Sequence, residues 1–498
     1  MKKRSEGPSS VPFKVLQFID PIFWVHLSIL FNLSCISGIF PNHWKPTIIN
    51  PTHKNGSKDI INNFRPISLL SFLSKLFEKC IASQLKAHLL KNNFLNSYQS
   101  GFRPKHSCTT ALTHYTDYIF KNLDKGNFIY SIFFDFSKAF DTLPHNLIIS
   151  MLKECGVSNV ELNWFISYLQ SRSFKVKIGN SMSKTFFNNS GVPQGSILGP
   201  LLFIIAINYL PNCIKSSKMF LYADDSSMSK AGPSSDVCAA TIIEDSRTFA
   251  YYSNKLGLIL NFTKTKVMVF SNNAISQPLI PIFINNNLID YVTKYNLLGL
   301  HLDPSLSWQL HIDHIVSKLG ACFFALNRTK FILNETYLKL ILNSLGISHM
   351  NYCSTIFSNA TQSSLNKITV KFNECCRSIL GLNSYSSGTA ARLHLGYMHP
   401  SDLYEFNKTV FMFDAINNCL PTYISNLLIE PCHSHNTRFR TGGNVSTQFF
   451  KSNTGQKSFS YWGPSVWAKV NLSLKLITNR NTFKHHLKNK FIAIQNSH

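Results

Sequence analysis

The sequence has no long uninterrupted run of apolar residues, and this absence argues against a membrane-spanning protein and against a protein with a signal peptide. The apolar stretch near the N-terminus, residues 22–40, contains His26, Asn32 and several serines, which favours a buried helix over a membrane span. The basic residues at the start of the chain are followed by polar residues 5–10 rather than by the apolar core of a signal peptide. We therefore expect a protein without a membrane segment that is not secreted and works in the nucleus, the cytoplasm or both.

The chain also lacks a cysteine framework, an internal repeat and a long low-complexity linker. Its 12 cysteines are scattered, so we expect them to be small core residues in a reducing compartment, without structural disulfides. Cys432, His433 and His435 lie close together, but no paired cysteine at zinc-knuckle spacing accompanies them, and loop polarity explains them better than zinc. With 498 residues and 44% hydrophobic content, the chain can form two or three domains.

Acidic residues are scarce: 24 Asp and Glu stand against 49 Lys and Arg, a formal net charge of +25. Such an excess attracts phosphate backbones independently of their sequence, and the attraction falls steeply with salt. The alternative is a merely basic surface in a chain rich in Asn, Ile, Lys and Phe. Charge therefore favours a nucleic-acid partner but does not decide the function.

Two adjacent carboxylates, Asp224 and Asp225, follow Tyr222 and Ala223 between an apolar run and a polar one. This pattern predicts a strand-turn-strand hairpin with both aspartates at its tip. At ~4 Å and an effective dielectric constant of ~20, two such charges repel by ~4 kcal/mol, so water or a divalent cation must compensate them. A solvated acidic turn is the alternative to a metal site.

A third carboxylate favours the metal site. Residues 128–134 form a continuous aromatic and β-branched run, typical of a strand buried on both faces, and the run ends directly at Asp135. Asp135, Asp224 and Asp225 together would hold two Mg²⁺ ions ~3.5–4 Å apart, the arrangement that stabilises the attacking and leaving oxygens in phosphoryl or nucleotidyl transfer. The chemistry indicated is polymerisation of nucleotides.

Several blocks occur in an order that resembles the reverse transcriptases of non-LTR (LINE-class) retrotransposons. The blocks are FPNHWK at 40–45, NFRPISLL at 63–70, QSGFRP at 99–104, DFSKAFD at 135–141, GVPQGSILGP at 191–200, YADD at 222–225 and LNFTKT at 260–265. So many ordered blocks exclude coincidence. The resemblance covers essentially the whole chain and is weakest beyond residue 385.

The resemblance implies an α+β fold, the right-hand polymerase, with fingers, a palm made of a small antiparallel sheet backed by helices, and a helical thumb. We assign fingers and palm to residues 1–309, the thumb to 310–385 and an accessory nucleic-acid-contacting region to 386–498. The basic residues Arg438, Arg440 and Lys451 belong to this last region.

Local patterns predict the elements around the acidic centre. A helix begins after Pro144 and ends at Gly156, and a second covers about 160–171. A hairpin spans 174–187 with a polar turn at 179–183, and a helix runs from about Ser196 to Leu210. Four later helices are predicted, each by apolar residues at helical spacing along one face. In chain order these faces consist of residues 312, 315, 316, 319, 322, 323 and 326; residues 337, 338, 341, 342 and 345; residues 365, 368, 372, 375 and 379; and residues 403, 406, 410 and 413.

The resemblance also implies roles for residues that would contact the substrate. Phe140 lies where similar enzymes place an aromatic ring under the incoming sugar, so it would exclude a 2′-hydroxyl; ordinary core packing is the alternative. Gln194 and Gly195 would approach the nucleotide or template, with Gln194 hydrogen-bonding the sugar or a base edge. Phe136, Tyr222 and Ala223 complete the predicted substrate-binding set.

Cations are expected on the triphosphate. Lys54 and Arg65 resemble the fingers cations that grip it, Arg as a bidentate ligand and Lys as a point charge. Lys264 lies where similar polymerases have a Lys that protonates the pyrophosphate leaving group, but Lys266 is close enough to leave that assignment open. Asp141 is expected to orient Lys or Arg neighbours.

The leading hypothesis is an RNA-directed DNA polymerase that uses two Mg²⁺ ions, with Mn²⁺ as a substitute. Its partners would be an RNA template, a DNA primer and deoxynucleoside triphosphates, with no membrane. Since no endonuclease region precedes the blocks, we expect the polymerase part of an element. The alternative is a catalytically silent, retrotransposon-derived RNA-binding protein. The amino-acid sequence of residues 136–141, FSKAFD, disfavours a group II intron maturase or a telomerase subunit.

Overall fold

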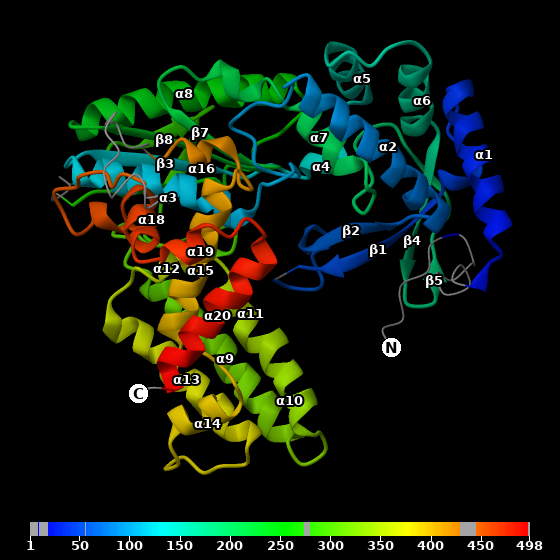
Figure 1. Ribbon diagram of the computed structural model, residues 1–498. Coiled ribbons are helices and arrows are strands. Elements are labelled where there is room, and N and C mark those ends of the chain that lie inside the picture. The colour runs from blue at the N-terminus through cyan, green and yellow to red at the C-terminus, as the bar shows by residue number, and fades with distance from the viewer. Residues whose placement is uncertain (1–7, 9–17, 55, 273–278, 429–444, 497–498) are drawn as a thin grey trace.

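The computed structural model describes residues 8, 18–54, 56–272, 279–428 and 445–496. Figure 1 shows a strand-rich upper part and a helical lower part, with a smaller body that contains β1, β2 and β4 beside them. The predicted α+β class is confirmed. The cysteines that the structure describes are all free.

A six-stranded sheet forms the centre of the fold, in the order β10-β11-β9-β3-β8-β7. Its strands are β3 (Phe128–Phe134), β7 (Lys218–Tyr222), β8 (Asp225–Gly232), β9 (Lys266–Phe270), β10 (Ile282–Ile284) and β11 (Asn287–Tyr291). β3 is antiparallel to both β8 and β9, and among the described strand pairs of this sheet the pair of β9 and β11 is parallel. The predicted palm sheet, the strand 128–134 and the hairpin around residues 222–225 are therefore confirmed.

Helices cover both faces of this sheet, as a continuous hydrophobic strand requires. α8 (Ser235–Lys255) lies above it and α3 (Cys108–Asp124) below it (Figure 1). Phe134 stacks on Phe249 of α8 with ring centroids 4.4 Å apart, whereas Phe133 packs against Tyr115 of α3 at 6.3 Å. The central strand is thus buried on both sides and rigidly placed.

A second sheet has five strands, in the order β2-β1-β4-β5 with β6 paired to β4. The strands are β1 (Thr47–His53), β2 (Phe64–Leu69), β4 (Arg172–Ile178), β5 (Ser181–Met182) and β6 (Phe186–Asn188). The predicted hairpin 174–187 is present, but the polar segment 179–183 contains β5. It pairs with the end of β4, so the connection is tighter than predicted.

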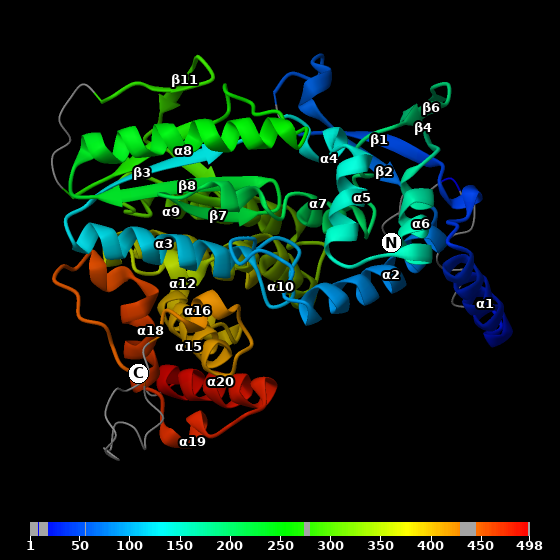
Figure 2. The same ribbon diagram turned by 90° about the horizontal axis from the view of Figure 1, so that it is seen from above.

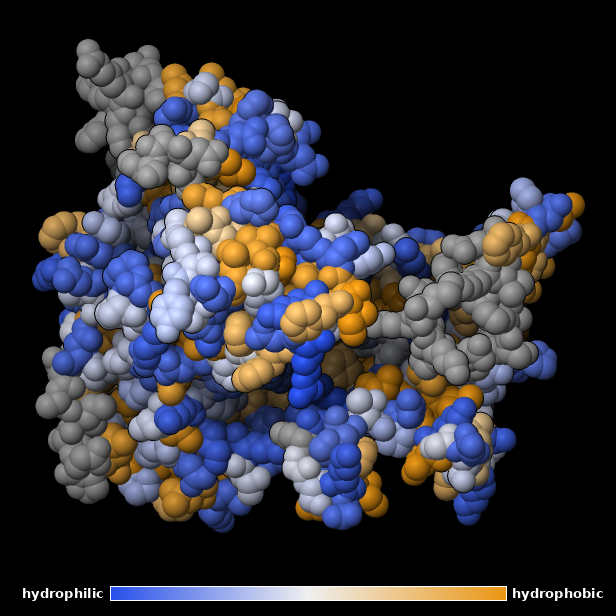
Figure 3. All heavy atoms as spheres, turned by 90° about the horizontal axis from the view of Figure 1, so that it is seen from below, coloured by the Kyte–Doolittle hydropathy of each residue, from blue (hydrophilic) through white to orange (hydrophobic). Residues whose placement is uncertain are grey.

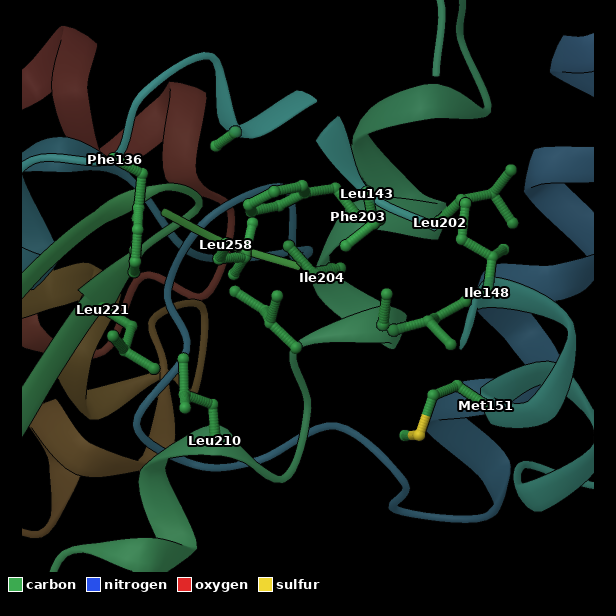
Figure 4. Close-up of a cluster of buried hydrophobic side chains, with 14 of the residues drawn as sticks. Phe136, Leu143, Ile148, Met151, Leu202, Phe203, Ile204, Leu210, Leu221 and Leu258 are labelled. Carbon is green, nitrogen blue, oxygen red and sulfur yellow. The ribbon is translucent and has the colours of Figure 1, made fainter. Parts of the chain in front are cut away.

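Helices join the two sheets. They are α2 (Phe72–Lys91), α4 (Ala139–Thr142), α5 (His145–Glu154), α6 (Asn159–Leu169) and α7 (Gly199–Ala206). α5 and α6 confirm the predicted helices. Figure 4 shows how α5, with Ile148 and Met151, packs against Leu202 and Phe203 of α7 in one buried cluster. This packing fixes the loop that precedes α7.

The prediction of a helix from Ser196 to Leu210 was wrong at both ends. The Ser196 side chain accepts a hydrogen bond from the Gly199 N–H at 2.7 Å, so it caps α7 from outside. A separate 3₁₀ turn, Leu210–Cys213, follows α7 and contains Pro211.

The prediction that residues 22–40 form a buried helix was also wrong. α1 (Pro21–Ser37) forms, but Ile22, Ile29 and Ile36 are 61%, 50% and 73% exposed. One face contacts α6, where Trp164 Nε1 donates to Ser34 Oγ at 3.1 Å. Phe31 also stacks on Phe77 of α2 at 4.3 Å, but these contacts leave the rest of an apolar helix exposed. None of the helices in the described ranges is both long and apolar enough to cross a membrane.

The lower part of Figure 1 is helical. It contains α9 (Gln309–Thr329), α10 (Glu335–Leu342), α11 (Ser348–Asn351), α12 (Ser354–Phe357), α13 (Gln362–Ile379) and α14 (Gly388–His394). A small sheet of β12 (Tyr295–Leu297) and β13 (Leu300–Leu302) contacts α9. The stripes predicted for α9 and α13 lie in the core, but Tyr337 and Leu345 are 56% and 50% exposed. A π-helical turn at Asn343–Ile347 interrupts the predicted stripe. From below, hydrophilic side chains alternate with hydrophobic patches (Figure 3).

The C-terminal helices pack beside α3 (Figure 2). They are α15 (Pro400–Ile416), α16 (Thr422–Ser425), α18 (Phe459–Ala468), α19 (Leu472–Lys475) and α20 (Arg480–Asn496). Asp117 of α3 accepts hydrogen bonds from the Ser460 N–H at 2.9 Å and its hydroxyl at 2.7 Å. Cys432, His433, His435, Arg438 and Arg440 lie outside the described residues. The three-part division 1–309, 310–385 and 386–498 stays a prediction.

Candidate active site

Three aspartates lie at one end of the central sheet. Phe134, the last residue of β3, pairs with Ser226 of β8, and Tyr222 pairs with Asp225 across the turn. One further step along this register places Asp135 opposite Asp225, and neighbouring strands lie only about 4.7–4.9 Å apart. Asp224 belongs to the two-residue turn between Tyr222 and Asp225. The structure therefore brings together the three carboxylates that the sequence singled out.

The pKa values of the three carboxyl groups reflect their burial and their proximity. Loss of water raises the pKa of Asp225 to about 6, with further contributions from the negative charges of Asp224 and Asp135. Loss of water and the charge of Asp135 also raise the pKa of Asp224. The pKa of Asp135 is raised by its partial burial. Each raised pKa means that the protein itself does not fully compensate the ionised carboxylates.

Lys54 and Arg65, the side chains predicted to bind the triphosphate, lie opposite these aspartates, on the part of the chain that forms the five-stranded sheet. Lys54 follows β1, where its N–H donates to Asn63 O at 2.8 Å, and Arg65 lies in β2. Both side chains are exposed, and the charges of both lower the pKa values of Asp224 and Asp225. Two sheets from separate parts of the chain thus supply opposite charges to one site.

The donor set fits a divalent cation. In the part of the chain that the structure describes, no group of three or more His, Cys, Asp or Glu side chains lies close enough together to hold a metal ion by itself. Mg²⁺ in nucleotide-handling sites is usually bound by one or two carboxylates together with substrate phosphates and water, so a complete protein cage is not required. The uncompensated charges of Asp135, Asp224 and Asp225 supply hard oxygen ligands of this kind.

The predicted sugar contact, Phe140, lies in α4 and is half-buried. Its ring stacks on Phe203 of α7 at 4.5 Å between centroids. Phe136 differs, because its side chain is 9% exposed and packs in the core near Phe249. Phe136 can therefore offer a substrate its backbone only.

Gln194 and Gly195 are held by the surrounding protein. The Gln194 amide donates to both carboxylate oxygens of Asp141, at 2.9 and 3.0 Å. Asp141 is thus bonded to Gln194 rather than to the Lys or Arg neighbour that we predicted. Gly195 has φ +131°, and a Cβ there would lie 2.5 Å from Ser68 O, so close packing against β2 already requires glycine.

The structure separates the two candidate lysines. Lys264 is exposed, and its charge lowers the pKa of Asp135. Lys266 lies within β9 and forms an ion pair with Asp290 at 2.6 Å. Of these two lysines, Lys264 is therefore the one whose charge acts on Asp135.

Sequence reasoning missed two buried side chains that hold the site together. Glu78 of α2 is fully buried, and its carboxylate accepts hydrogen bonds from the N–H groups of Ile197 and Leu198 at 2.7 and 3.3 Å. Gln99 is 2% exposed and bonds the turn of the aspartates. Gln99 stands within a quoted block, but no local pattern reveals a partner more than a hundred residues away.

The sequence matches the family described as "Reverse transcriptase (RNA-dependent DNA polymerase)" over residues 52–302, about half of the chain. It is 28% identical over 402 residues to a probable RNA-directed DNA polymerase from transposon BS of Drosophila melanogaster, covering 78% of this chain and 44% of that protein. It is 24% identical over 444 residues to the RNA-directed DNA polymerase from mobile element jockey of the same species, covering 86% and 46%. The chain thus spans less than half the length of these relatives.

Among solved structures, apo telomerase from Candida tropicalis is similar with a TM-score of 0.41 at 12% identity. The similarity covers 82% of this chain and 72% of that one.

Proposed function

The chain belongs to the reverse transcriptase family, with relatives in non-LTR retrotransposons, and from this premise we propose that it is an RNA-directed DNA polymerase. It would add deoxynucleotides to the 3′ end of a DNA primer on an RNA template. The observation that carries the proposal is the meeting of Asp135, Asp224 and Asp225 at one end of the central sheet, opposite Lys54 and Arg65.

Reverse transcriptases use divalent metal ions. We propose that Asp135, Asp224 and Asp225 hold two Mg²⁺ ions here, with Mn²⁺ as a substitute. Bound there, the cations supply the positive charge that stabilises the attacking and leaving oxygens of nucleotidyl transfer. The raised pKa of Asp225 supports this assignment, because a bound cation would relieve the repulsion among the three groups.

The cationic side chains would act on the triphosphate. Lys54 and Arg65 bind its oxygens, Arg65 through a bidentate contact. As the primer 3′-oxygen bonds to the α-phosphorus, the bond to the β-phosphate breaks and pyrophosphate leaves. Lys264 donates a proton to that leaving group, which its exposure and its position near Asp135 support.

The remaining predicted residues would select and orient the nucleotide. The exposed part of the Phe140 ring lies under the sugar and excludes a 2′-hydroxyl, while Phe203 supports its other face. Gln194 is oriented by Asp141 and presents its carbonyl oxygen to the sugar or base. Gly195, Tyr222, Ala223 and the Phe136 backbone complete the nucleotide site.

The same proposal assigns fingers and palm to residues 1–309, a thumb to 310–385 and an accessory nucleic-acid contact to 386–498. The charge of +25 supports contact with an RNA template and a DNA primer.

A primer-extension assay with the purified chain tests this function. A labelled DNA primer on an RNA template should lengthen with deoxynucleotides and Mg²⁺, and EDTA should stop the reaction. Template binding without extension, in Mg²⁺ and in Mn²⁺, would instead favour the catalytically silent RNA-binding protein.

A further inference from the structure

The loop before α3 lies against the edge of β7. The Ser100 N–H donates to Leu221 O at 2.8 Å, and the Leu221 N–H donates to Tyr98 O at 3.1 Å. Gln99 and Leu221 therefore form a parallel bridge, as if the loop added a short strand to the sheet. The bridge is one residue away from Tyr222, where the turn that carries the aspartates begins.

The Gln99 side chain continues this contact into the turn itself. Its Oε1 accepts hydrogen bonds from the N–H groups of Ala223 at 2.8 Å and Gly101 at 2.7 Å. Its Nε2 donates to Ala223 O at 3.4 Å. Both backbone polar groups of Ala223 are thus bonded by one side chain that is 2% exposed. A buried amide with these partners cannot move without leaving polar groups unpaired.

The turn needs such a constraint, because Ala223 has φ +58°. This left-handed region is unfavourable for a residue with a Cβ and is readily adopted only by glycine. The packing around the turn is equally tight: a Cβ on Gly101 would lie 2.3 Å from the Ala223 nitrogen. Residues 99–101 therefore set both the conformation of the turn and its distance from the loop.

We propose that Gln99 is a positioning residue, which holds the turn at Ala223 so that Asp224 and Asp225 face Asp135 at a fixed distance. The inference rests on the proposed polymerase function for its catalytic consequence, but the restraint on the turn is a property of the fold. A displacement of about 1 Å in such a site costs up to about a hundredfold in rate.

The C-terminal helices brace the same loop. The Tyr423 hydroxyl of α16 lies 3.0 Å from Ser100 Oγ and 3.2 Å from Thr110 Oγ1, and its ring stacks on His114 at 4.6 Å. Lys105 Nζ donates to Asn418 O at 2.8 Å. The loop is therefore held between the catalytic turn and a region more than 300 residues later, which limits how far it can relax.

Two variants of the full chain test the proposal. Gln99→Met keeps the side-chain length but removes the acceptor and donor, and Gln99→Asn keeps an amide that is one methylene too short. Each should lower kcat for primer extension by about tenfold to a hundredfold, raise the Mg²⁺ concentration needed for half-maximal rate, and change template binding by less than twofold. If Gln99→Met does not fold, Gln99→Asn carries the test alone.

A mutant cycle separates positioning from general loss of stability. Glycine adopts φ +58° without strain. The factor by which Gln99→Asn lowers kcat should therefore be several times smaller in an Ala223→Gly background than in the wild type. Tyr130→Phe is the matched control, because it removes a partly buried side-chain hydrogen bond, to Ser235 at 2.8 Å, where β3 pairs with β8 five residues beyond Asp225. It should lower the melting temperature without changing the Mg²⁺ requirement.

Hydrogen exchange supplies a readout without catalysis. The amides of residues 221–225 should exchange at least tenfold faster in Gln99→Asn than in the wild type or in Tyr130→Phe. Unchanged exchange would overturn the positioning role even if the wild-type chain proved inactive. Two results would overturn the effect of Gln99 on catalysis. One is faster exchange with an unchanged kcat, and the other is an equal decrease in kcat with Ala223 and with Ala223→Gly. An inactive wild type with faster exchange in the variant would instead refute the polymerase function.

Discussion

Lys266 Nζ lies 2.6 Å from a carboxylate oxygen of Asp290, across the parallel pair of β9 and β11. This ion pair holds the Lys266 side chain against the neighbouring strand β11. Lys264, two residues earlier, is exposed and acts electrostatically on Asp135. This difference supports our proposal that Lys264, rather than Lys266, donates the proton to pyrophosphate.

The first prediction follows from this difference. Lys264→Gln should lower kcat by about a hundredfold, since a positioned general acid contributes about 10²–10⁴-fold. The matched variant Lys266→Gln should stay within about threefold of wild type, because it removes only a partly exposed ion pair worth about 0–1 kcal/mol. Single-turnover extension by both variants measures this, and an equal or inverted loss would contradict the assignment.

A second prediction concerns pH. The pKa of Asp225 is raised to about 6, whereas its ordinary value is 3.8, and a protonated carboxyl cannot bind a metal ion. At low Mg²⁺, extension should therefore fall about tenfold per pH unit below about pH 6, and more Mg²⁺ should shift the midpoint to lower pH. A midpoint that ignores Mg²⁺ would speak against Asp225 as a ligand.

The same pKa has a consequence for stability. The folded protein binds the Asp225 proton more tightly than the unfolded chain, so this contribution to stability is complete below about pH 4 and is lost as pH rises through about 6. Asp225→Asn should then stabilise the metal-free protein at pH 8 by about 1 kcal/mol, after allowance for the exposure of the side chain. Thermal unfolding in EDTA measures the difference, and a lower melting temperature would be the contrary result.

A third prediction tests sugar selection by Phe140. If the ring blocks a 2′-hydroxyl, Phe140→Ala should raise ribonucleotide incorporation relative to deoxynucleotide incorporation. Both rates will fall, because loss of a fully buried ring costs ~3–5 kcal/mol of stability, and somewhat less for this half-buried one. The ratio in competition reactions with matched nucleotides is the informative quantity. An unchanged ratio in a folded, active variant would return Phe140 to a packing role against Phe203.

A fourth prediction uses the charge of the chain. With a formal net charge of +25, several Lys and Arg side chains should contact phosphates, and each contact adds about −0.9 to the log–log slope of affinity against salt for duplex DNA. Titration of a labelled template–primer at several salt concentrations measures the slope. A slope near zero would show that the charge does not serve nucleic-acid binding.

The elements closest to the chemistry were predictable from local sequence. The run 128–134 encodes a strand buried on both faces, and the two-residue spacing at 222–225 encodes a tight turn, because each pattern depends on neighbours along the chain. The grouping of Asp135 with Asp224 and Asp225 was proposed from the chemistry that adjacent carboxylates need, and the resemblance supported it. Periodicity cannot tell which strands become neighbours.

The errors share one cause, which is the dependence of burial and helix ends on distant partners. α1 is apolar but largely exposed, since α6 and Phe77 of α2 cover only part of its surface, and Ser196 caps α7 because Glu78 holds the preceding loop. Gln99 was missed for the same reason, as its partner Ala223 is far along the chain. Local composition carries no information about such contacts.

Substitution of Asp224 tests the central claim most directly. Asp224→Asn keeps the shape of the turn but removes a ligand charge, and a lost metal ligand costs several kcal/mol in the transition state, with each ~1.36 kcal/mol worth tenfold. Extension of a DNA primer on an RNA template in Mg²⁺ should fall at least about a thousandfold, while template–primer affinity stays within about twofold of wild type. Near-normal extension by the folded Asp224→Asn variant would contradict the assignment of these three aspartates as the metal-binding centre.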